Sequence, residues 1–232
     1  MDKNEQDLLK KQAAIQAAKM VKPGMNLGVG TGSTVMFFID ALAKRNEETP
    51  LSLNSIVTTS NRSQKRLEQY GFQVEVLSEV DQLDLTVDGA DRVDTNLDGI
   101  KGRGGALTLE KNVAVNSKRN VWIVDQSKVV DHLSGFVLPV EVLPVSCEQV
   151  KAKFEKEGLN PKFRIADNGL RYVTHYGNYI LDLNIDPIPV PHGLADYLNH
   201  TVGVVEHGLF LDICDEVLIA KQDGTIEDRT RQ

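Results

Sequence analysis

The chain has 232 residues, of which 41% are hydrophobic and 25% are charged. These proportions are ordinary for a folded globular protein and exclude a disordered one. The formal net charge of -7, without any basic stripe, argues against a nucleic-acid partner, so an anionic ligand has to be held by local positive groups.

The first part of the chain alternates between helices and strands. Residues 5–20 fit an amphipathic helix that Pro23-Gly24 ends, and a strand at 25–30 leads through a glycine-rich turn into a second helix. The same alternation predicts strands at 53–60, 72–78, 83–91 and 121–128, and helices at 61–71 and 107–118. This order implies a mostly parallel sheet with helices on both faces, which is an α/β fold.

From about residue 133 the pattern changes. It predicts a strand at 136–145, a helix at 146–158, strands at 161–166 and 169–184 around an Asn-Gly turn, a helix at 192–200 and a strand at 201–207. This is the order of a ferredoxin-like α+β unit. Residues 214–230 supply a strand and a turn that can rejoin the first sheet. We therefore expect one domain formed by 1–132 and 206–232, with 133–205 inserted.

Cysteines, histidines and the N-terminus further narrow the class of protein. Cys147 and Cys214 belong to no CxxC or metal-like spacing, so we expect reduced thiols, with a single disulfide as the alternative. The five histidines have no HExxH-type spacing, which argues against a bound metal. Residues 1–20 contain no apolar signal-peptide core, and no run approaches the roughly 18 apolar residues of a membrane span. We expect a cytoplasmic protein without a membrane partner.

The glycine-rich turn at 28–34, GVGTGST, has the features of a phosphate-binding turn. Its glycines allow close backbone approach, and its hydroxyls at the start of a helix suit an anion, although such turns serve many anions. A dinucleotide site would need glycine at Ser33 and an acidic residue where Thr58-Thr59-Ser60 end the second strand, and a Walker loop would need Gly-Lys-Ser/Thr. A small phosphorylated metabolite fits better than a nucleotide.

Residues 84–111 gather several chemically active groups. Asp88 and Asp91 end an apolar strand, which favours function over a solvated turn, and Lys101 beside flexible glycines can neutralise an oxyanion. Glu110 begins the next helix, where a glutamate is also explained by the helix macrodipole. Lys128, at the end of the next strand, offers a second cation. Together these groups can bind an anion and move a proton.

Six segments resemble those of type A ribose-5-phosphate isomerases, and the similarity covers nearly the whole chain. They are GVGTGST, TTS, VDGAD, KGRGGALTLEK, DQSK and LPVEVLP. The resemblance implies a Rossmann-like catalytic domain with a ferredoxin-like lid, assembled as a homodimer or homotetramer. It further implies reversible conversion of D-ribose 5-phosphate to D-ribulose 5-phosphate in the pentose phosphate pathway, without metal or cofactor.

The same resemblance assigns residue roles. Glu110 would be the base that moves a proton between C2 and C1, Asp88 and Asp91 would contact the sugar hydroxyls, and Lys101 would stabilise the enediolate. The other implied substrate contacts are Thr31, Gly32, Ser33, Thr34, Gly89, Ala90, Gly102, Arg103, Gly104, Lys128 and Lys10.

Two other classes of protein remain possible from the sequence. A sugar-phosphate-binding regulator would use a similar scaffold, but it needs a DNA-binding domain, for which the stretch before Gly24 is too short. A sugar-phosphate deaminase or acyl-transfer enzyme on a related fold would use a different acid-base set. Release of ammonia from an amino sugar phosphate, against conversion of aldose to ketose, separates the deaminase from the isomerase.

Overall fold

The computed structural model describes residues 3–231, which form two compact units. Within that part, unit 1 comprises residues 3–90, 109–129 and 212–231, and unit 2 comprises residues 91–108 and 130–211. The inserted domain expected at 133–205 falls inside unit 2, which also takes in the loop 91–108. The expected domain bounds themselves stay a prediction.

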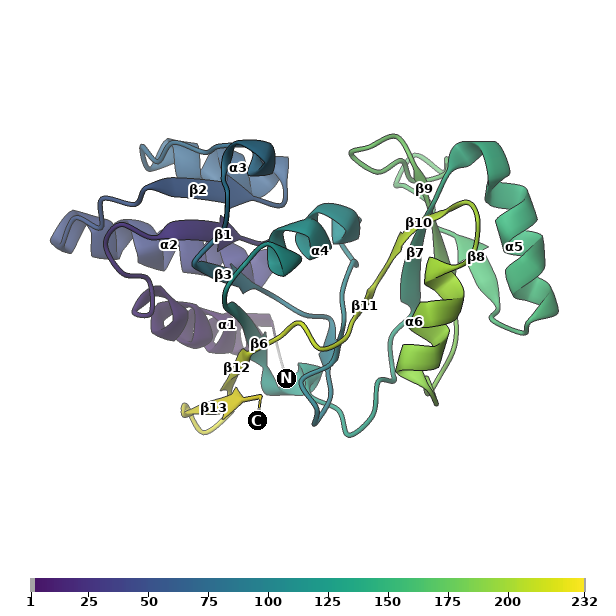
Figure 1. Cartoon of the computed structure of the whole chain (residues 1–232). Helices are drawn as coiled ribbons and strands as arrows, with labels where there is room; N and C mark the ends of the chain where they lie inside the picture. Colours follow the sequence, from purple (N-terminus) through teal and green to yellow (C-terminus); the bar gives the residue numbers. More distant parts are fainter. Residues whose placement is uncertain (1–2, 232) are drawn as a thin grey trace. The chain divides into compact units, whose positions relative to one another are not determined.

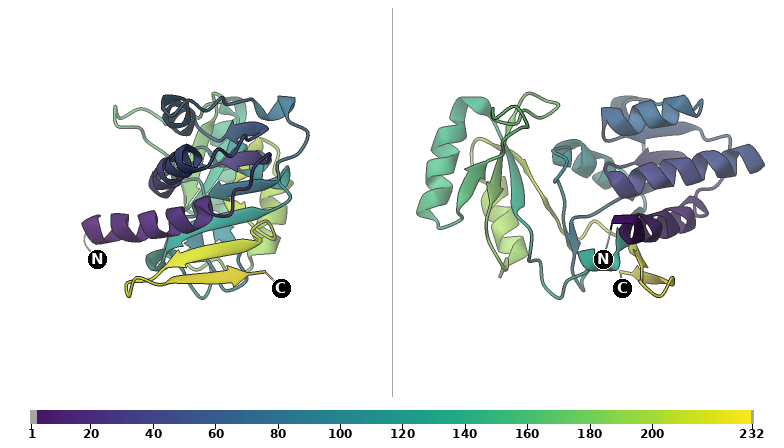
Figure 2. Two further views of the ribbon diagram at one scale, coloured as in Figure 1. Left: turned by 90° about the vertical axis from the view of Figure 1, so that its left-hand side faces the viewer. Right: turned by 180° about the vertical axis from the view of Figure 1, so that it is seen from behind.

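Unit 1 is built on a six-stranded sheet (Figures 1 and 2). Its strands are β1 (Asn26–Val29), β2 (Ser55–Thr58), β3 (Leu85–Asp88), β6 (Asn120–Asp125), β12 (Glu216–Ala220) and β13 (Ile226–Thr230). They lie in the order β13-β12-β6-β3-β1-β2, and every pair is parallel except β12 with β13. The expected mostly parallel sheet is confirmed, and residues 214–230 do rejoin it.

Helices cover both faces of this sheet, as expected. They are α1 (Lys3–Ala18), α2 (Ser33–Glu48), α3 (Asn61–Gln69) and α4 (Leu107–Val115), the last of which begins in unit 2 and continues into unit 1. Helices α1 and α2 lie side by side (Figure 1). They share a core with Leu27, Val87 and Ile123 of the sheet. On the other face, Val113 of α4 packs with Val57. Gly28 permits this approach, because a Cβ there would lie 3.0 Å from Val113 Cγ1.

The prediction of a strand at 72–78 is wrong. Residue Glu75 makes one isolated bridge to Val57 at the edge of the sheet, and residues Leu77–Glu79 form a 3-10 helix, η1. Phe72 and Val74 pack against the core of unit 1. Their alternation with polar residues therefore reflects packing beside the edge strand β2. An alternating sequence alone cannot distinguish such a segment from one that is paired in a sheet.

Unit 2 contains a four-stranded antiparallel sheet of βαββαβ order, which confirms the ferredoxin-like prediction. Its elements are β7 (Leu138–Val142), η3 (Pro144–Ser146), α5 (Cys147–Lys156), β8 (Pro161–Phe163), β9 (Tyr179–Leu183), α6 (Pro191–Asn199) and β10 (Val204–His207), with the sheet order β10-β7-β9-β8. One face of β7, with Val140, packs on Phe154 of α5 and Leu198 of α6. By alternation, Glu141 points to the opposite face.

The hairpin between β8 and β9 is less regular than expected. Gly169 adopts a positive φ of 79° at the expected turn, and Ala166 and Leu170 pair across it. The chain returns to a regular strand only at Tyr179.

Unit 2 contains a second sheet that was not expected from the sequence. It joins three strands of two residues each in the order β11-β5-β4. They are β4 (Arg92–Val93), β5 (Gly99–Ile100) and β11 (Leu209–Phe210).

Both cysteines are buried free thiols, as expected. Burial raises the pKa of Cys214 to about 12, so its thiol stays protonated at neutral pH.

Across residues 3–231, no helix combines the length and apolar character that a membrane crossing requires.

Candidate active site

The strand order of unit 1 reverses between β1 and β3. The chain passes from β1 to β2 on one side, whereas β3 and β6 continue on the other. In open α/β sheets, ligands bind outside the carboxyl ends of strands at such a switch point. The glycine-rich turn follows β1 and Asp88 ends β3, so two of the motifs found in the sequence meet there.

Asp88 is held firmly at this point. Its Oδ1 accepts hydrogen bonds from the backbone N–H of Thr31 at 2.9 Å and of Gly89 at 2.7 Å, and only 3% of the residue is exposed. Gly30 leaves room for the carboxylate, because a Cβ at that position would lie 1.9 Å from Asp88 Cγ. Asp88 therefore has a fixed position and orientation.

The turn that follows Gly30 is braced from the second strand and from α3. The hydroxyls of Thr31 and Thr59 lie 2.6 Å apart, and Ser63 Oγ donates to the carbonyl of Gly30 at 2.6 Å. Gly32 is the N-cap of α2 at a φ of 115°, which suits glycine, and it offers no capping side chain. The N-terminal amides of α2 thus open onto the turn, which gives it the electrostatics of an anion site.

Glu110 lies on the same face of the sheet as Asp88. Residues two apart in a strand share a face, so Asp88 lies on the same face of the sheet as Thr86. The side chains of Thr86 and of Val113 in α4 both lie against Gly28, so this is the face that α4 covers. Helix α4 leads into β6, which is parallel to β3, so the helix runs against the strands. Glu110, three residues before Val113, is therefore displaced toward the carboxyl edge where Asp88 lies. Its side chain is buried, with 5% of the residue exposed.

Two lysines are associated with the carboxyl end of β6. Asp125 accepts a hydrogen bond from the backbone of Ser127 at 2.9 Å, which starts the 3-10 helix η2 (Gln126–Lys128) and places Lys128 just beyond the strand. Gln6 of α1 donates to the other oxygen of Asp125 at 3.3 Å. Lys10, one turn later on α1, lies on the same side of that helix and forms an ion pair with Asp7 at 3.2 Å.

In unit 2, the small three-stranded sheet positions Asp91 and Lys101. The backbone N–H of Asp91 donates to Ile100 at 2.9 Å, and Asp91 Oδ2 accepts from the N–H of Arg103 at 3.0 Å. The N–H of Lys101 donates to the carbonyl of Gly208 at 2.9 Å. The Lys101 side chain is buried, with its Nζ 5.3 Å from the centre of the Phe210 ring.

The loop after Lys101 is held by two residues that the sequence did not single out. Arg164 Nη1 donates to the carbonyls of Gly102 at 2.8 Å and Arg103 at 3.0 Å. Its Nε donates to Asp182 at 3.0 Å. Tyr172 donates its hydroxyl hydrogen to the carbonyl of Gly104 at 3.3 Å. No local pattern marks these two residues, since each lies in an ordinary strand-like segment.

A buried glutamate fixes the first turn of α4. Glu141, 1% exposed, accepts hydrogen bonds from the hydroxyl of Thr174 at 2.8 Å, from the amide of Asn178 at 2.9 Å and from the hydroxyl of Thr108. These donors offset part of the cost of burying a carboxylate. Thr108 precedes Glu110 by two residues, so Glu141 anchors the start of the helix that carries Glu110.

The residues expected to bind or convert a ligand are thus distributed over both units. Unit 1 carries Lys10, Thr31, Gly32, Ser33, Thr34, Asp88, Gly89, Ala90, Glu110 and Lys128, and unit 2 carries Asp91, Lys101, Gly102, Arg103 and Gly104. Hydrogen bonds join Thr31, Asp88 and Gly89 in the first set, and Asp91 and Arg103 in the second. Among residues 3–231, no three His, Cys, Asp or Glu side chains are grouped so that they could hold a metal ion. Chemically, unit 1 offers carboxylates beside an anion turn, and unit 2 offers a buried ammonium.

Comparisons with known proteins agree with one another. The family model for ribose 5-phosphate isomerase A (phosphoriboisomerase A) matches residues 55–224. The ribose-5-phosphate isomerase A of Lactobacillus gasseri is 72% identical over 232 residues, which are 100% of both chains.

Two solved structures are similar over nearly their whole length. Ribose 5 phosphate isomerase A from Neisseria gonorrhoeae is 37% identical, with a TM-score of 0.90 and 98% of each chain covered. A D-ribose-5-phosphate isomerase in complex with phospho-erythronic acid is 32% identical, with a TM-score of 0.93 and 100% of each chain covered. With these matches in sequence and structure, the chain belongs to the ribose 5-phosphate isomerase A family.

Proposed function

We propose that this chain interconverts D-ribose 5-phosphate and D-ribulose 5-phosphate through an enediolate. The observation that carries the proposal is the placement of Glu110 on the face and edge of the sheet where Asp88 is immobilised beside the glycine-rich turn. The names of the similar proteins support it, as does the phospho-erythronic acid bound to one of them.

Glu110 is the base in this proposal. Its carboxylate takes the proton from C2 of the open-chain aldose, the C2–H electron pair forms the C1=C2 double bond, and the aldehyde oxygen O1 becomes an oxyanion. Glu110 then returns the proton to C1. One carboxylate that can reach both carbons is enough for this transfer, which therefore needs no hydride carrier.

The remaining charged groups act on the oxygens. Lys101 provides the positive charge that stabilises the enediolate oxygen, and a buried ammonium is more effective for this than an exposed one. Asp88 and Asp91 contact the sugar hydroxyls, assist ring opening and pass the proton of O2 to O1. The two backbone hydrogen bonds to Oδ1 of Asp88 hold its carboxyl group in one orientation for this role.

The turn Thr31–Thr34 and the two lysines hold the substrate in this proposal, with phosphate contacts among them. Three features of unit 1 support this role: the open N-terminus of α2, the hydroxyl groups of the turn, and the cations Lys10 and Lys128 near the end of β6. In unit 2, the backbone of Gly102, Arg103 and Gly104 completes the set of substrate contacts. Gly89 and Ala90 contribute backbone next to Asp88.

We further propose that the reaction needs neither metal nor cofactor and belongs to the non-oxidative pentose phosphate pathway. The proposed enzyme is cytoplasmic and assembles as a homodimer or homotetramer. The resemblance to the family supports these statements, and the two buried free thiols fit a reducing compartment.

A coupled assay for ribulose 5-phosphate formed from ribose 5-phosphate, with and without EDTA, tests the proposal. We expect equal rates under both conditions. An amino sugar phosphate supplied in parallel should release no ammonia. Failure to form the ketose, or ammonia release at a comparable rate, would overturn the assignment, and loss of activity in EDTA would overturn metal independence.

A further inference from the structure

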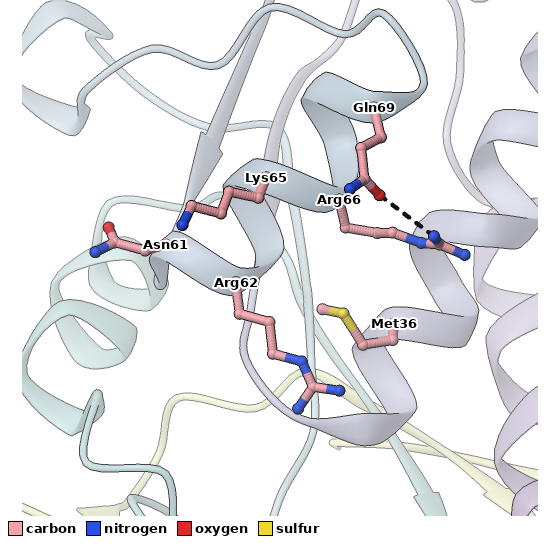
Figure 3. A pocket seen from close by; sticks show the side chains of 6 residues that line it. All are labelled: Met36, Asn61, Arg62, Lys65, Arg66 and Gln69. Carbon is pink, nitrogen blue, oxygen red and sulfur yellow. Dashed lines mark hydrogen bonds between the residues drawn. The ribbon is translucent and has the colours of Figure 1, made fainter.

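Helices α2 and α3 of unit 1 line an open surface hollow of about 630 Å³ that the proposed reaction does not use. Its lining is Met36 from α2 and Asn61, Arg62, Lys65, Arg66 and Gln69 from α3. Figure 3 shows the thioether of Met36 reaching from α2 toward α3, between the side chains of Arg62 and Arg66. The hollow therefore combines an apolar floor with three cations and two side-chain amides.

The three cations differ in how they are held. Arg66 is fixed, because its Nη2 lies 2.7 Å from Asp40 Oδ1 and its guanidinium lies over the ring of Tyr70 at 5.0 Å. Among residues 3–231, the side chains of Arg62 and Lys65 have no hydrogen-bond or ion-pair partner, and both residues are exposed. Asp40 balances the charge of Arg66, so the hollow keeps two uncompensated positive charges.

The hollow borders the turn that we propose to hold the substrate. Met36 lies in the first turn of α2, two residues after Thr34. Asn61 begins α3 one residue after Ser60, which follows Thr59, and the Thr59 hydroxyl contacts that of Thr31 at 2.6 Å. Both walls thus start at the carboxyl edge of the sheet.

We propose that this hollow is an outer binding site for phosphate-bearing anions. Arg62 and Lys65 supply the charge, and the amides of Asn61 and Gln69 supply hydrogen bonds to phosphate oxygens. In a chain of net charge -7, two uncompensated cations in a hollow form a local positive field that concentrates anions. The consequence for turnover rests on the proposed function. By attracting the sugar phosphate, the outer site raises its local concentration beside the Thr31–Thr34 turn.

Binding can be tested without reference to turnover. Inorganic phosphate is titrated into the 15N-labelled chain while NMR follows the Asn61 and Gln69 side-chain amides and the Arg62 Nε–H. We expect these signals to shift in the native chain and in the control Lys19→Gln/Lys22→Gln, which removes two exposed charges from the same unit. We expect no shift at Asn61 and Gln69 in Arg62→Gln/Lys65→Gln. Shifts confined to the Thr31–Thr34 amides in the native chain would overturn the outer site.

Kinetics test the consequence. At an ionic strength of about 0.01 M, Arg62→Gln/Lys65→Gln should raise KM for ribose 5-phosphate by about three- to tenfold, as expected for two charges acting on a dianion at around 10 Å. The difference should vanish near 0.5 M salt, and kcat should not change. An unchanged KM at low salt would overturn the steering role. Absence of turnover by the native chain would instead contradict the proposed function and leave the NMR result to decide on the outer site.

Discussion

The backbone N–H of Thr31 donates a 2.9 Å hydrogen bond to Oδ1 of Asp88, and this bond ties the turn after β1 to the end of β3. It lies where the strand order reverses. The same contact that shapes the anion turn therefore fixes the carboxylate proposed to act on the sugar. In the proposed function, phosphate binding and sugar orientation therefore depend on one local geometry.

Gly30→Ala tests this geometry. The added Cβ would fall 1.9 Å from Asp88 Cγ, so the carboxylate has to move. We expect a loss of about 1–3 kcal/mol in the free energy of unfolding and a large loss of kcat. Gly193→Ala is the control, since its Cβ would meet a Val190 methyl at 3.2 Å. Native activity in Gly30→Ala would contradict the role of Asp88.

Glu110→Gln should leave ribose 5-phosphate binding nearly intact while kcat falls by about 10²- to 10⁴-fold, the usual contribution of a general base. Calorimetry measures the binding, and the coupled assay measures the turnover. The exposed Glu68→Gln on α3 serves as the control and should behave as the native chain. Near-normal deuterium incorporation from solvent at C1 or C2 by Glu110→Gln would refute the assignment.

Lys101→Ala should lower kcat by roughly 10²-fold or more, because an ammonium that stabilises the enediolate acts mainly in the transition state. The exposed Lys162→Ala in the same unit provides a matched loss of charge and should leave kcat unchanged. If Lys101→Ala raises KM while turnover at saturation stays native, Lys101 binds the phosphate instead.

Arg164→Met should loosen the loop that follows Lys101. It removes the donors to the carbonyls of Gly102 and Arg103, and we expect kcat to fall by about tenfold through a misplaced Lys101. Hydrogen exchange of the amides at 102–105 should accelerate in parallel. Arg171→Met, which breaks the ion pair with Glu148 in the same unit, should change neither quantity. Equal effects of the two variants would reduce Arg164 to a general stabilising residue.

Asp84 gives a pH-dependent contribution to stability. Hydrogen bonds from Lys118 and from the backbone of Asn26 lower the pKa of Asp84 below its usual 3.8. A lowered pKa means that its stabilisation is fully present above the unfolded pKa and is lost as pH falls through the folded one. We expect Asp84→Asn to cost at most about 1 kcal/mol at pH 7, because the pair is partly exposed.

Urea unfolding of the native chain and of Asp84→Asn, measured at neutral pH and again well below the folded pKa, checks this expectation. The difference between the two chains should shrink toward zero in acid. A difference that is independent of pH would show that the charge of Asp84 contributes nothing.

Much of the sheet of unit 1 could be predicted from sequence, because its strands are short apolar runs that end in turn or acidic residues. Asp88 is an example, since the buried strand before it fixes its place at the carboxyl edge. The prediction of a strand at 72–78 failed. Phe72 and Val74 alternate with polar residues because they pack against the core at the edge of the sheet, without pairing as a strand. The pattern reports burial, and it does not report the hydrogen-bond partner.

The support of the candidate site was harder to predict. Strands β4, β5 and β11 have two residues each, too few to show any period. Arg164 and Glu141 act through tertiary contacts with Gly102 and Thr108, which lie far away in the sequence. Such partners depend on how distant segments pack, and one sequence carries no local sign of them.

The hydrogen bond from Lys101 to Gly208 has a consequence for how the protein matures. During synthesis, Lys101 leaves the ribosome long before Gly208 is made, so its loop cannot acquire this backbone partner until most of the chain has emerged. Contacts of such sequence separation form late and slow the approach to the native state. Lys101, the residue proposed to stabilise the enediolate, should therefore be among the last parts of the molecule to reach its final place. Strands β1 and β3 should have paired before it does.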